Sequence, residues 1–260
     1  MSAIDVIGLL IPVTWLTMLA LEALFPARRF PPIRFWRWIG AGFFLMIAFI
    51  ASIVPLIVPR AWFAEHRLID ASWLGVAGGT IVGYALLTFV AYWWHRSVHR
   101  FDPMWRAFHQ IHHAPHRMDV AGANLVHPLE AIVFTFINMG VLSLVLGLEP
   151  LAVALVGYLS TFAAFFQHWN IRTPRWLGYF IQRPESHCIH HQRGVHAFNY
   201  ADLPLWDMLF GTFRNPKDFS GEVGFDPPAD RRFGAMLAFA DVNAPIHSKG
   251  TRGATAAAEA

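Results

Sequence analysis

The chain has 260 residues, of which 55% are hydrophobic and only 14% are charged, and its mean hydropathy is +0.40. A soluble domain carries about 25% charged residues, so the composition argues against a soluble protein and predicts a membrane protein. The formal charge of +3 comes without a basic stripe interleaved with aromatic residues, which gives no sign of nucleic-acid binding. The single cysteine, Cys188, excludes an intramolecular disulfide and a cysteine-rich metal site.

Five apolar stretches approach the length of a membrane span, because a bilayer core about 30 Å thick needs about 20 apolar residues of helix. The first lacks the positively charged start of a secretory signal and carries Asp5 instead, so we interpret it as a retained span. The last two are shorter and are joined only by a turn at residues 147–150, so they could form a hairpin that returns without a full crossing. The stretches are residues 4–24, 39–58, 71–94, 129–147 and 150–166.

Arginine residues in the short loops predict the orientation of these helices, because such loops are retained in the cytoplasm. Residues 25–38 contain four arginines and no acidic residue, whereas residues 59–70 balance two arginines against two acids. With residues 25–38 inside, residues 95–128 and the segment after residue 167 also face the cytoplasm. We therefore expect an integral multi-pass protein of a bacterial cytoplasmic membrane, with a cap of surface helices after residue 167 and a disordered end, TRGATAAAEA.

Eight of the fourteen histidines are concentrated in three clusters, all in segments expected on the cytoplasmic face. One histidine pair at helical spacing arises often by chance, and a histidine beside an arginine often only faces solvent. Three clusters on one face favour a metal site, since residues three and four apart share a helix face and imidazole binds iron, zinc, copper and nickel. Eight ligands are too many for one ion and suit two. The clusters are HRSVH with His95 and His99, HQIHH with His109, His112 and His113, and HCIHH with His187, His190 and His191.

These clusters resemble the eight-histidine signature of the fatty acid hydroxylase and sterol desaturase superfamily, which are integral membrane di-iron enzymes. The surrounding stretches WHRSVHRFDPMWRAFHQIHHAPHRMDV, NLVHPLE, FFQHWN and NYADLPLWDMLFGTF carry the same resemblance, from about residue 84 to residue 215. The departures are Cys188, where the family often has arginine, and Ala201, where it often has glycine. Neither departure falls on a ligand position.

The resemblance implies a di-iron centre that uses O₂ to hydroxylate or desaturate a lipid such as a fatty acyl chain or a sterol, with hydroxylation favoured by the breadth of the family. Electrons must then come from a separate reductase, ferredoxin or cytochrome. The sequence itself contains no dinucleotide-binding motif, no iron–sulfur cysteine set and no cytochrome b5-like HPGG. Together these features predict an all-α, multi-pass helical membrane protein with a cytoplasmic, histidine-lined di-metal cap. We divide it into N-terminal transmembrane helices (1–70), a fatty acid hydroxylase-like di-iron domain (71–216) and a polar C-terminal tail (217–260).

Other residues have more open roles. The resemblance implies that His168 is a ninth ligand, and that His127 is either a ligand or a neighbour of one. We expect His116 and His196 to be solvated, His66 and His247 to be uninvolved, and Cys188 to be a small buried residue rather than a thiolate ligand. Carboxylates that could orient imidazole N–H groups are Asp102, Glu130, Glu185, Asp202 and Asp207.

Two other classes of protein are also rich in histidine. A membrane metal transporter, or a metal-binding protein without oxidase activity, would place ligands or acids in the middle of its spans. A membrane b-type cytochrome would place histidine pairs inside facing helices. Here the clusters follow the ends of the spans, which favours the oxidase over both alternatives.

Overall fold

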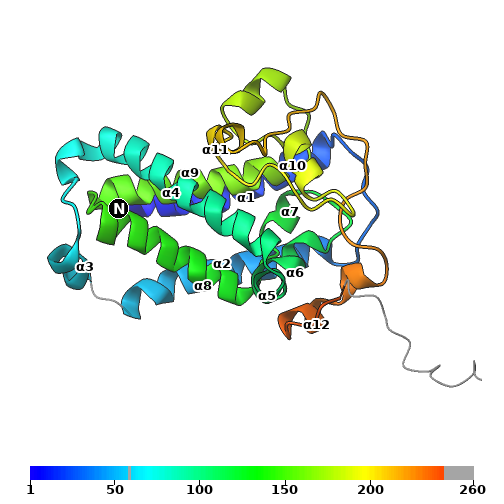
Figure 1. Cartoon of the computed structure of the whole chain (residues 1–260), viewed down its shortest axis with the longest axis horizontal. Helices are drawn as coiled ribbons and strands as arrows, with labels where there is room; N and C mark the ends of the chain where they lie inside the picture. The colour runs from blue at the N-terminus through cyan, green and yellow to red at the C-terminus, as the bar shows by residue number, and fades with distance from the viewer. Residues whose placement is uncertain (58–59, 243–260) are drawn as a thin grey trace, which may run out of the picture.

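The computed structural model describes residues 1–57 and 60–242, and within these residues the chain is helical, without a β-strand. Five long helices form a bundle, and short helices and loops cover one end of it (Figure 1). This is the all-α, multi-pass architecture predicted from the sequence. The long helices are α1 (Ala3–Leu24), α2 (Trp36–Ile57), α4 (Gly75–Arg100, preceded by η1, Ser72–Leu74), α8 (Pro128–Met139, continued by the π-helical turn η3, Gly140–Val145) and α9 (Pro150–His168).

All five long helices are apolar enough to cross a membrane. The candidate spans contain 18 to 29 residues and have mean hydropathies of 1.5 to 2.3. Much of this apolar surface faces outward: Leu16, Phe49 and Ile81 are all more than half exposed. Water solvates such a surface poorly, whereas a lipid bilayer solvates it well and requires the internally hydrogen-bonded backbone of a helix. The five spans predicted from the sequence are therefore confirmed as long apolar helices.

Helix α4 is longer than the apolar stretch that predicted it, because it continues from residue 94 to Arg100. Between Gly83 and Pro103 the sequence has no glycine or proline to end a helix. The helix therefore runs through the first histidine cluster. As a result, His95 and His99 lie on a helix whose other end is anchored deep in the bundle.

Close packing fixes α4 against α9 and the turn that precedes it. A Cβ atom on Gly83 would lie 2.7 Å from Cδ1 of Leu148 and 3.1 Å from Cγ2 of Val156. Real Cβ atoms essentially never approach another atom this closely, so a larger residue here would have to displace the side chain of Leu148. The packing sets the relative depth of the two helices whose C-terminal ends bear His95, His99 and His168.

The hairpin formed by α8 and α9 extends to the end of the bundle opposite the histidines. Its turn contains Gly147, which has a φ of 57°. Beside this turn, the N–H groups of Leu68 and Ile69 donate to the carbonyls of Leu144 and Val145 at 2.7 and 3.0 Å. The hairpin thus reaches the loop that leads into α4, and it is as deep as the first three long helices.

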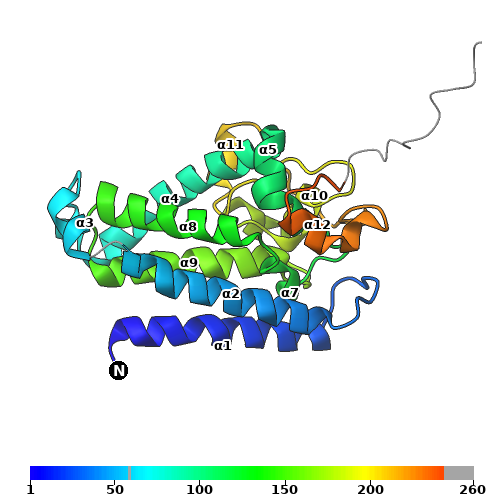
Figure 2. The same ribbon diagram turned by 90° about the horizontal axis from the view of Figure 1, so that it is seen from below.

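The two ends of the bundle differ. The N-terminus and α3 (Arg60–His66) lie at one end, while the loop between α1 and α2 and all the remaining short helices lie at the other (Figures 1 and 2). The loop arginines predict this arrangement, in which residues 25–38 lie at the histidine end and residues 60–70 lie at the other end. The short helices at the covered end are α5 (Asp102–Met104), η2 (Trp105–His109, π-helical), α6 (Gln110–His113), α7 (Val120–Ala123), η4 (Arg175–Tyr179), α10 (Pro184–His190), α11 (Leu205–Leu209), η5 (Ala229–Arg231) and α12 (Phe233–Leu237).

We refer to residues 169–242 as the cap. Its last part, residues 217–242, belongs to the stretch set apart above as a polar tail, yet it contributes Phe225 and Met236 to a buried cluster with Ile111. The N–H of Phe225 also donates to the carbonyl of Ala114 at 3.1 Å. This part of the chain therefore packs directly on the second histidine cluster. Residues 243–260, with His247 and the end expected to be disordered, lie outside the described residues.

Candidate metal centre

Nine histidine side chains form two groups at the covered end of the bundle. Within each group, one ring nitrogen of every member lies within 4.8 Å of those of all the others. The rings of His113 and His191, one from each group, stack with centroids 4.0 Å apart, so the groups are neighbours. The five-histidine group consists of His95, His99, His109, His113 and His190, and the four-histidine group consists of His112, His168, His187 and His191.

The order of the histidines in the sequence explains why there are two groups. His112 is followed directly by His113, and His190 by His191. Consecutive residues of a helix point about 100° apart. Each such pair therefore sends one imidazole into each group, and the remaining histidines on α4, η2, α9 and α10 complete the two sets.

Contacts between imidazoles have the spacing of ligands around one ion. Metal–nitrogen bonds of about 2.1 Å that meet at right angles put two ligand nitrogens about 3 Å apart. Three pairs of Nε2 atoms have this spacing, with one pair in the five-histidine group and two in the other. They are His95 with His109 at 2.9 Å, His112 with His168 at 3.1 Å, and His187 with His191 at 3.2 Å.

Unpaired nitrogen atoms also point to a metal. The Nε2 atoms of His99, His113 and His190 are buried, and none has a hydrogen-bond partner among the described residues. Native proteins rarely leave buried polar atoms unpaired unless a water or an ion meets them. The five-histidine group therefore fits a metal ion, and so does its neighbour by the spacing of its Nε2 atoms.

Burial keeps these imidazoles neutral, as metal ligands must be. It lowers the pKa of His109 to about 3, because a charged ring would be desolvated. It lowers the pKa of His113 well below the ordinary value of 6.5, because a charged ring there would be desolvated and would also face other imidazoles. The pKa is lowered well below 6.5, for the same reason, in His112, His187, His190 and His191. At neutral pH the lone pairs of these residues are free to bind a cation.

Backbone carbonyls orient two ligands of the five-histidine group. Nδ1 of His95 lies 2.7 Å from the carbonyl oxygen of Tyr200, and Nδ1 of His190 lies 2.7 Å from that of Phe198. A carbonyl only accepts, so Nδ1 carries the proton and Nε2 carries the lone pair. The loop that contains Phe198 and Tyr200 thus sets the tautomer and the direction of both rings.

Side chains orient two further ligands of this group. Nδ1 of His109 lies 2.8 Å from Oε1 of Glu130, one of the carboxylates named from the sequence. Nδ1 of His113 lies 3.0 Å from Nδ1 of His196. Burial lowers the pKa of His196 to about 4, so this ring is neutral. His196 is therefore a neighbour of a candidate ligand and not the solvated residue expected from the sequence.

Asp207 acts on the centre through the backbone. Its two carboxylate oxygens accept the N–H groups of Tyr200 and Ala201, both at 2.9 Å, and Oδ1 also accepts the hydroxyl of Thr212 at 2.7 Å. Tyr200 in turn presents its carbonyl to His95. Asp207 therefore fixes the loop that orients a candidate ligand, although it contacts no histidine ring itself among the described hydrogen bonds.

The other histidines named from the sequence lie in different places. His168 is a member of the four-histidine group, and its Nδ1 donates to the carbonyl of Ala164 at 2.7 Å. His127 belongs to neither group and caps α8, where its Nδ1 accepts the N–H of Leu129 at 3.1 Å. His116 is buried rather than solvated, and its Nδ1 lies 2.5 Å from Asp230.

Three of the remaining candidates, Asp102, Asp202 and Cys188, belong to neither histidine group. Asp102 forms an exposed ion pair with Arg106, and Asp202 accepts a hydrogen bond from Gln167 at 3.1 Å. Cys188 is fully buried, and burial raises the pKa of its thiol to about 12. It is therefore a neutral residue of the core, as expected.

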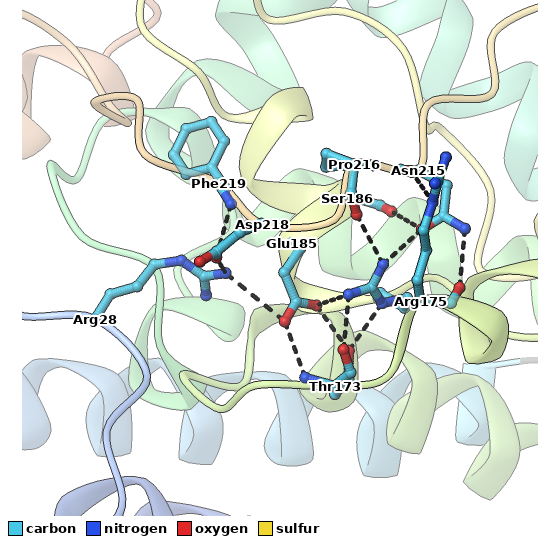
Figure 3. Close-up of polar contacts among 10 residues, drawn as sticks. Arg28, Thr173, Arg175, Glu185, Ser186, Asn215, Pro216, Asp218 and Phe219 are labelled. Carbon is cyan, nitrogen blue, oxygen red and sulfur yellow. Dashed lines mark hydrogen bonds and ion pairs between the residues drawn. The ribbon is translucent and has the colours of Figure 1, made fainter.

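A buried polar network anchors the start of α10. Arg183 is fully buried, and it donates to the carbonyl of Thr173 at 2.8 Å and to Oδ1 of Asn215 at 2.7 Å. Glu185 accepts the N–H of Thr173 at 2.9 Å and pairs with Arg28 at 3.8 Å (Figure 3). These bonds join α10 to other parts of the cap and to the loop after α1. They place the third histidine cluster relative to the bundle.

Several neighbours of the centre were not predicted from the sequence. The ring of Trp105 lies 5.1 Å from those of His99 and His113, and the ring of Tyr200 lies 5.5 Å from that of His95. Orienting carbonyls have no side-chain signature at all. Trp105 could have been suspected from its spacing, since it precedes His109 by one helical turn.

Comparisons with known proteins show to which family the chain is similar. The family described as "Fatty acid hydroxylase" matches residues 80–212, just over half of the chain. An ornithine lipid hydroxylase of Rhizobium tropici is 30% identical over 207 residues, which are 77% of this chain and 59% of that protein. A sphingolipid C4-hydroxylase of Schizosaccharomyces pombe is 28% identical, over 48% of this chain and 44% of that protein.

A human alkylglycerol monooxygenase is 30% identical over 55% of this chain and 30% of its own length. The chain thus matches between about a third and three fifths of the length of these relatives. No solved structure gives a significant match.

Proposed function

The chain belongs to the fatty acid hydroxylase family, and we propose that it is a membrane-bound di-iron enzyme that uses O₂ to hydroxylate a lipid. The observation that carries this proposal is the pair of adjacent groups of neutral imidazoles at one end of a lipid-facing bundle. The names of the relatives support a lipid substrate, since they specify an ornithine lipid, a sphingolipid and an alkylglycerol. We propose a polar membrane lipid with a long hydrocarbon chain.

The identity of the metal rests on the family and on the reaction. Nitrogen ligands alone favour copper and zinc over iron. When bound, two ferrous ions supply the electrons that reduce O₂ to an oxidant able to attack an unactivated C–H bond. A hydroxylation of this kind also consumes two electrons from outside, which we assign to a separate reductase, ferredoxin or cytochrome.

The chain's own residues bind, orient and shield the centre. The nine histidines of the two groups would hold the ions, His95 and His190 in directions set by the carbonyls of Tyr200 and Phe198. Glu130 keeps the proton of His109 on Nδ1, so that Nε2 faces the centre. The rings are largely buried, which keeps bulk water away from a reactive oxidant.

Growth under oxygen-18 gas tests the reaction. We expect a lipid that carries one oxygen-18 atom in cells with the wild-type chain, and its loss with His190→Ala. A product two hydrogens lighter, without label, would mean desaturation. A product that forms equally well without O₂ would overturn the oxidase assignment.

We also propose that the centre faces the cytoplasm. The loop between α1 and α2, with Arg28, Arg29 and Arg34, lies at the histidine end, which supports this orientation (Figure 2). A cysteine that replaces Phe30 should be shielded from an impermeant thiol reagent in intact cells, and one that replaces Glu65 should react. Reaction at position 30 alone would reverse the orientation.

A further inference from the structure

We infer that α11, although part of the cap, is inserted in the bilayer, where its outward face contacts the acyl chains of the leaflet beside the metal centre. This inference needs only that the bundle spans a membrane, and it does not depend on the reaction proposed above. It assigns a lipid-contacting role to a short helix in the polar third of the chain.

The outward face of this helix is apolar throughout. Leu205, Met208, Leu209 and Phe210 are 38% to 62% exposed, and they are close neighbours along the chain. The carboxylate within the helix points the other way, since Asp207 is fully buried. In water this group of exposed side chains would be unfavourable, and a neighbouring charge would be expected to break it up.

Helix α11 packs against the C-terminal half of α4 (Figure 1). The indole N–H of Trp206 donates to Oγ1 of Thr88 at 3.0 Å, and the rings of Trp206 and Phe89 lie 5.0 Å apart. Thr88 precedes Arg100 by 12 residues, which is about 18 Å along a helix. Helix α11 therefore lies alongside a span and not beyond its end.

The polar boundary on α4 lies on the far side of this contact. Arg96 donates to the hydroxyl of Tyr92 at 2.8 Å, and its guanidinium lies 5.5 Å from the centre of the Trp93 ring. An arginine above a tryptophan at the end of a span marks the level of the lipid headgroups. Phe210 packs at this level on Tyr92 and Trp93, at 5.3 and 4.9 Å. The contacts of Trp206 with Thr88 and Phe89 lie on the apolar side of it.

We expect lipid to cover this face of α11, because the face continues the lipid-facing surface of α4. On α4 itself, Ile81 is 71% exposed and Trp93 is 41% exposed. Helix α11 also holds the loop of residues 198–200 through Asp207, whose carboxylate accepts the N–H of Tyr200. A hydrocarbon chain that passes α11 therefore lies beside the loop that orients His95.

Spin labels on single cysteines test the inference. The full chain would be labelled at Leu209→Cys and placed in vesicles of phosphatidylcholine and phosphatidylglycerol. Ile81→Cys on α4 serves as the lipid reference, and Glu222→Cys, on a side chain 76% exposed, serves as the water reference. The unsubstituted chain gives the background from Cys188, which is buried.

We expect the label at position 209 to collide several-fold more often with O₂ than with a water-soluble nickel chelate, as at position 81, and the ratio to be reversed at position 222. A ratio at position 209 like that at position 222 would overturn the inference. Shielding from both reagents, with dipolar broadening between labelled copies, would also overturn it by showing that a second copy of the chain covers α11.

Discussion

In the five-histidine group, carbonyls and side chains from distant parts of the chain set the direction of the rings. His95 and His190 donate to the loop at residues 198–200, and His109 donates to Glu130 on α8. In the four-histidine group, His168 donates within its own helix to Ala164. Nδ1 of His187 is buried and has no hydrogen-bond partner in the described part of the chain.

The rings around the two groups differ as well. Trp105 and Tyr200 contact the five-histidine group, whereas the ring contacts of the four-histidine group, within residues 1–57 and 60–242, are all with other histidines. The geometry of the first group thus depends on remote hydrogen bonds. That of the second depends on the packing of α6, α9 and α10. Substitutions outside the ligands should therefore weaken metal binding in one group and not in the other. Substitution of a ligand should be equally severe in either group.

Loss of a ligand should have the largest effect and should be equally severe in both groups. His190→Ala removes an imidazole from the five-histidine group, and His112→Ala removes one from the other. A protein that binds about two ions per chain should retain about one in each variant. Activity should fall by more than about 100-fold, because the two ions act together.

Metal analysis of the purified variants checks this expectation. His66→Ala is the control, since His66 is exposed at the opposite end of the bundle, where it stacks on Trp62. If His190→Ala retained its full metal content, the five-histidine group would not be a metal site. If His112→Ala alone did so, the four-histidine group would not be a metal site.

Acid should destabilise the metal-free protein through a property that both groups share. Burial holds the pKa of His109 at about 3 and that of His187 well below 6.5 in the folded chain, whereas an unfolded histidine titrates near 6.5. Below about pH 6.5 the unfolded chain therefore binds more protons, and the free energy of unfolding falls as the pH falls. Each such histidine contributes up to about 1.4 kcal/mol per pH unit.

The midpoint of thermal unfolding of the metal-free protein in detergent should thus decrease steeply from about pH 7 to about pH 5. His66→Ala is again the control, because this side chain is exposed at the opposite end of the bundle. A midpoint that is constant over this range would show that the imidazoles are solvated and not buried.

The sequence predicted the spans and the three histidine clusters because both depend on local patterns. Apolar length predicts a span, and spacings of three and four place histidines on one helix face. The consecutive pairs His112–His113 and His190–His191 already imply two groups, but which of the other histidines joins each group was not predictable, since it depends on how α4, η2, α9 and α10 pack. Orientation by the carbonyls of Phe198 and Tyr200 has no side-chain signal, because any residue provides a carbonyl.

The prediction that His196 is solvated is wrong for a related reason. A histidine in a polar loop is usually solvated, but here the loop folds back over α6 and places His196 at 3.0 Å from His113. Residues 217–242 look polar, yet two of them, Phe225 and Met236, are buried in a hydrophobic cluster with Ile111. Long-range packing of this kind leaves little trace in composition.

Glu130 is the first residue that should distinguish the two groups. Glu130→Ala removes the acceptor of His109 and should weaken metal binding in the five-histidine group by about 10- to 100-fold, while the four-histidine group keeps its affinity. Glu130→Gln keeps an oxygen at the same place and should lose less. Glu65→Gln, on exposed α3, is the control.

A competition titration with a metal chelator should resolve two steps in the wild-type chain, and only one of them should move in the Glu130 variants. If both steps moved together, the two groups would be coupled more strongly than their separate hydrogen bonds imply. If neither moved, the bond between His109 and Glu130 would not contribute to metal binding.

Asp207 should have the smallest effect and should sharpen the comparison most, because it acts on a ligand only through the backbone. Asp207→Asn leaves the N–H of Tyr200 or of Ala201 without its carboxylate acceptor and loosens the loop that receives the His95 proton. The loss of one such hydrogen bond costs about 1 kcal/mol, or about fivefold in the affinity of the five-histidine group. Tyr200→Phe should leave this affinity unchanged, since the carbonyl and not the hydroxyl contacts His95. The same chelator titration separates the outcomes. Equal losses in the two variants would show that the tyrosine hydroxyl contributes as much as Asp207, and a loss in the four-histidine group would mean that Asp207→Asn disturbs the whole cap.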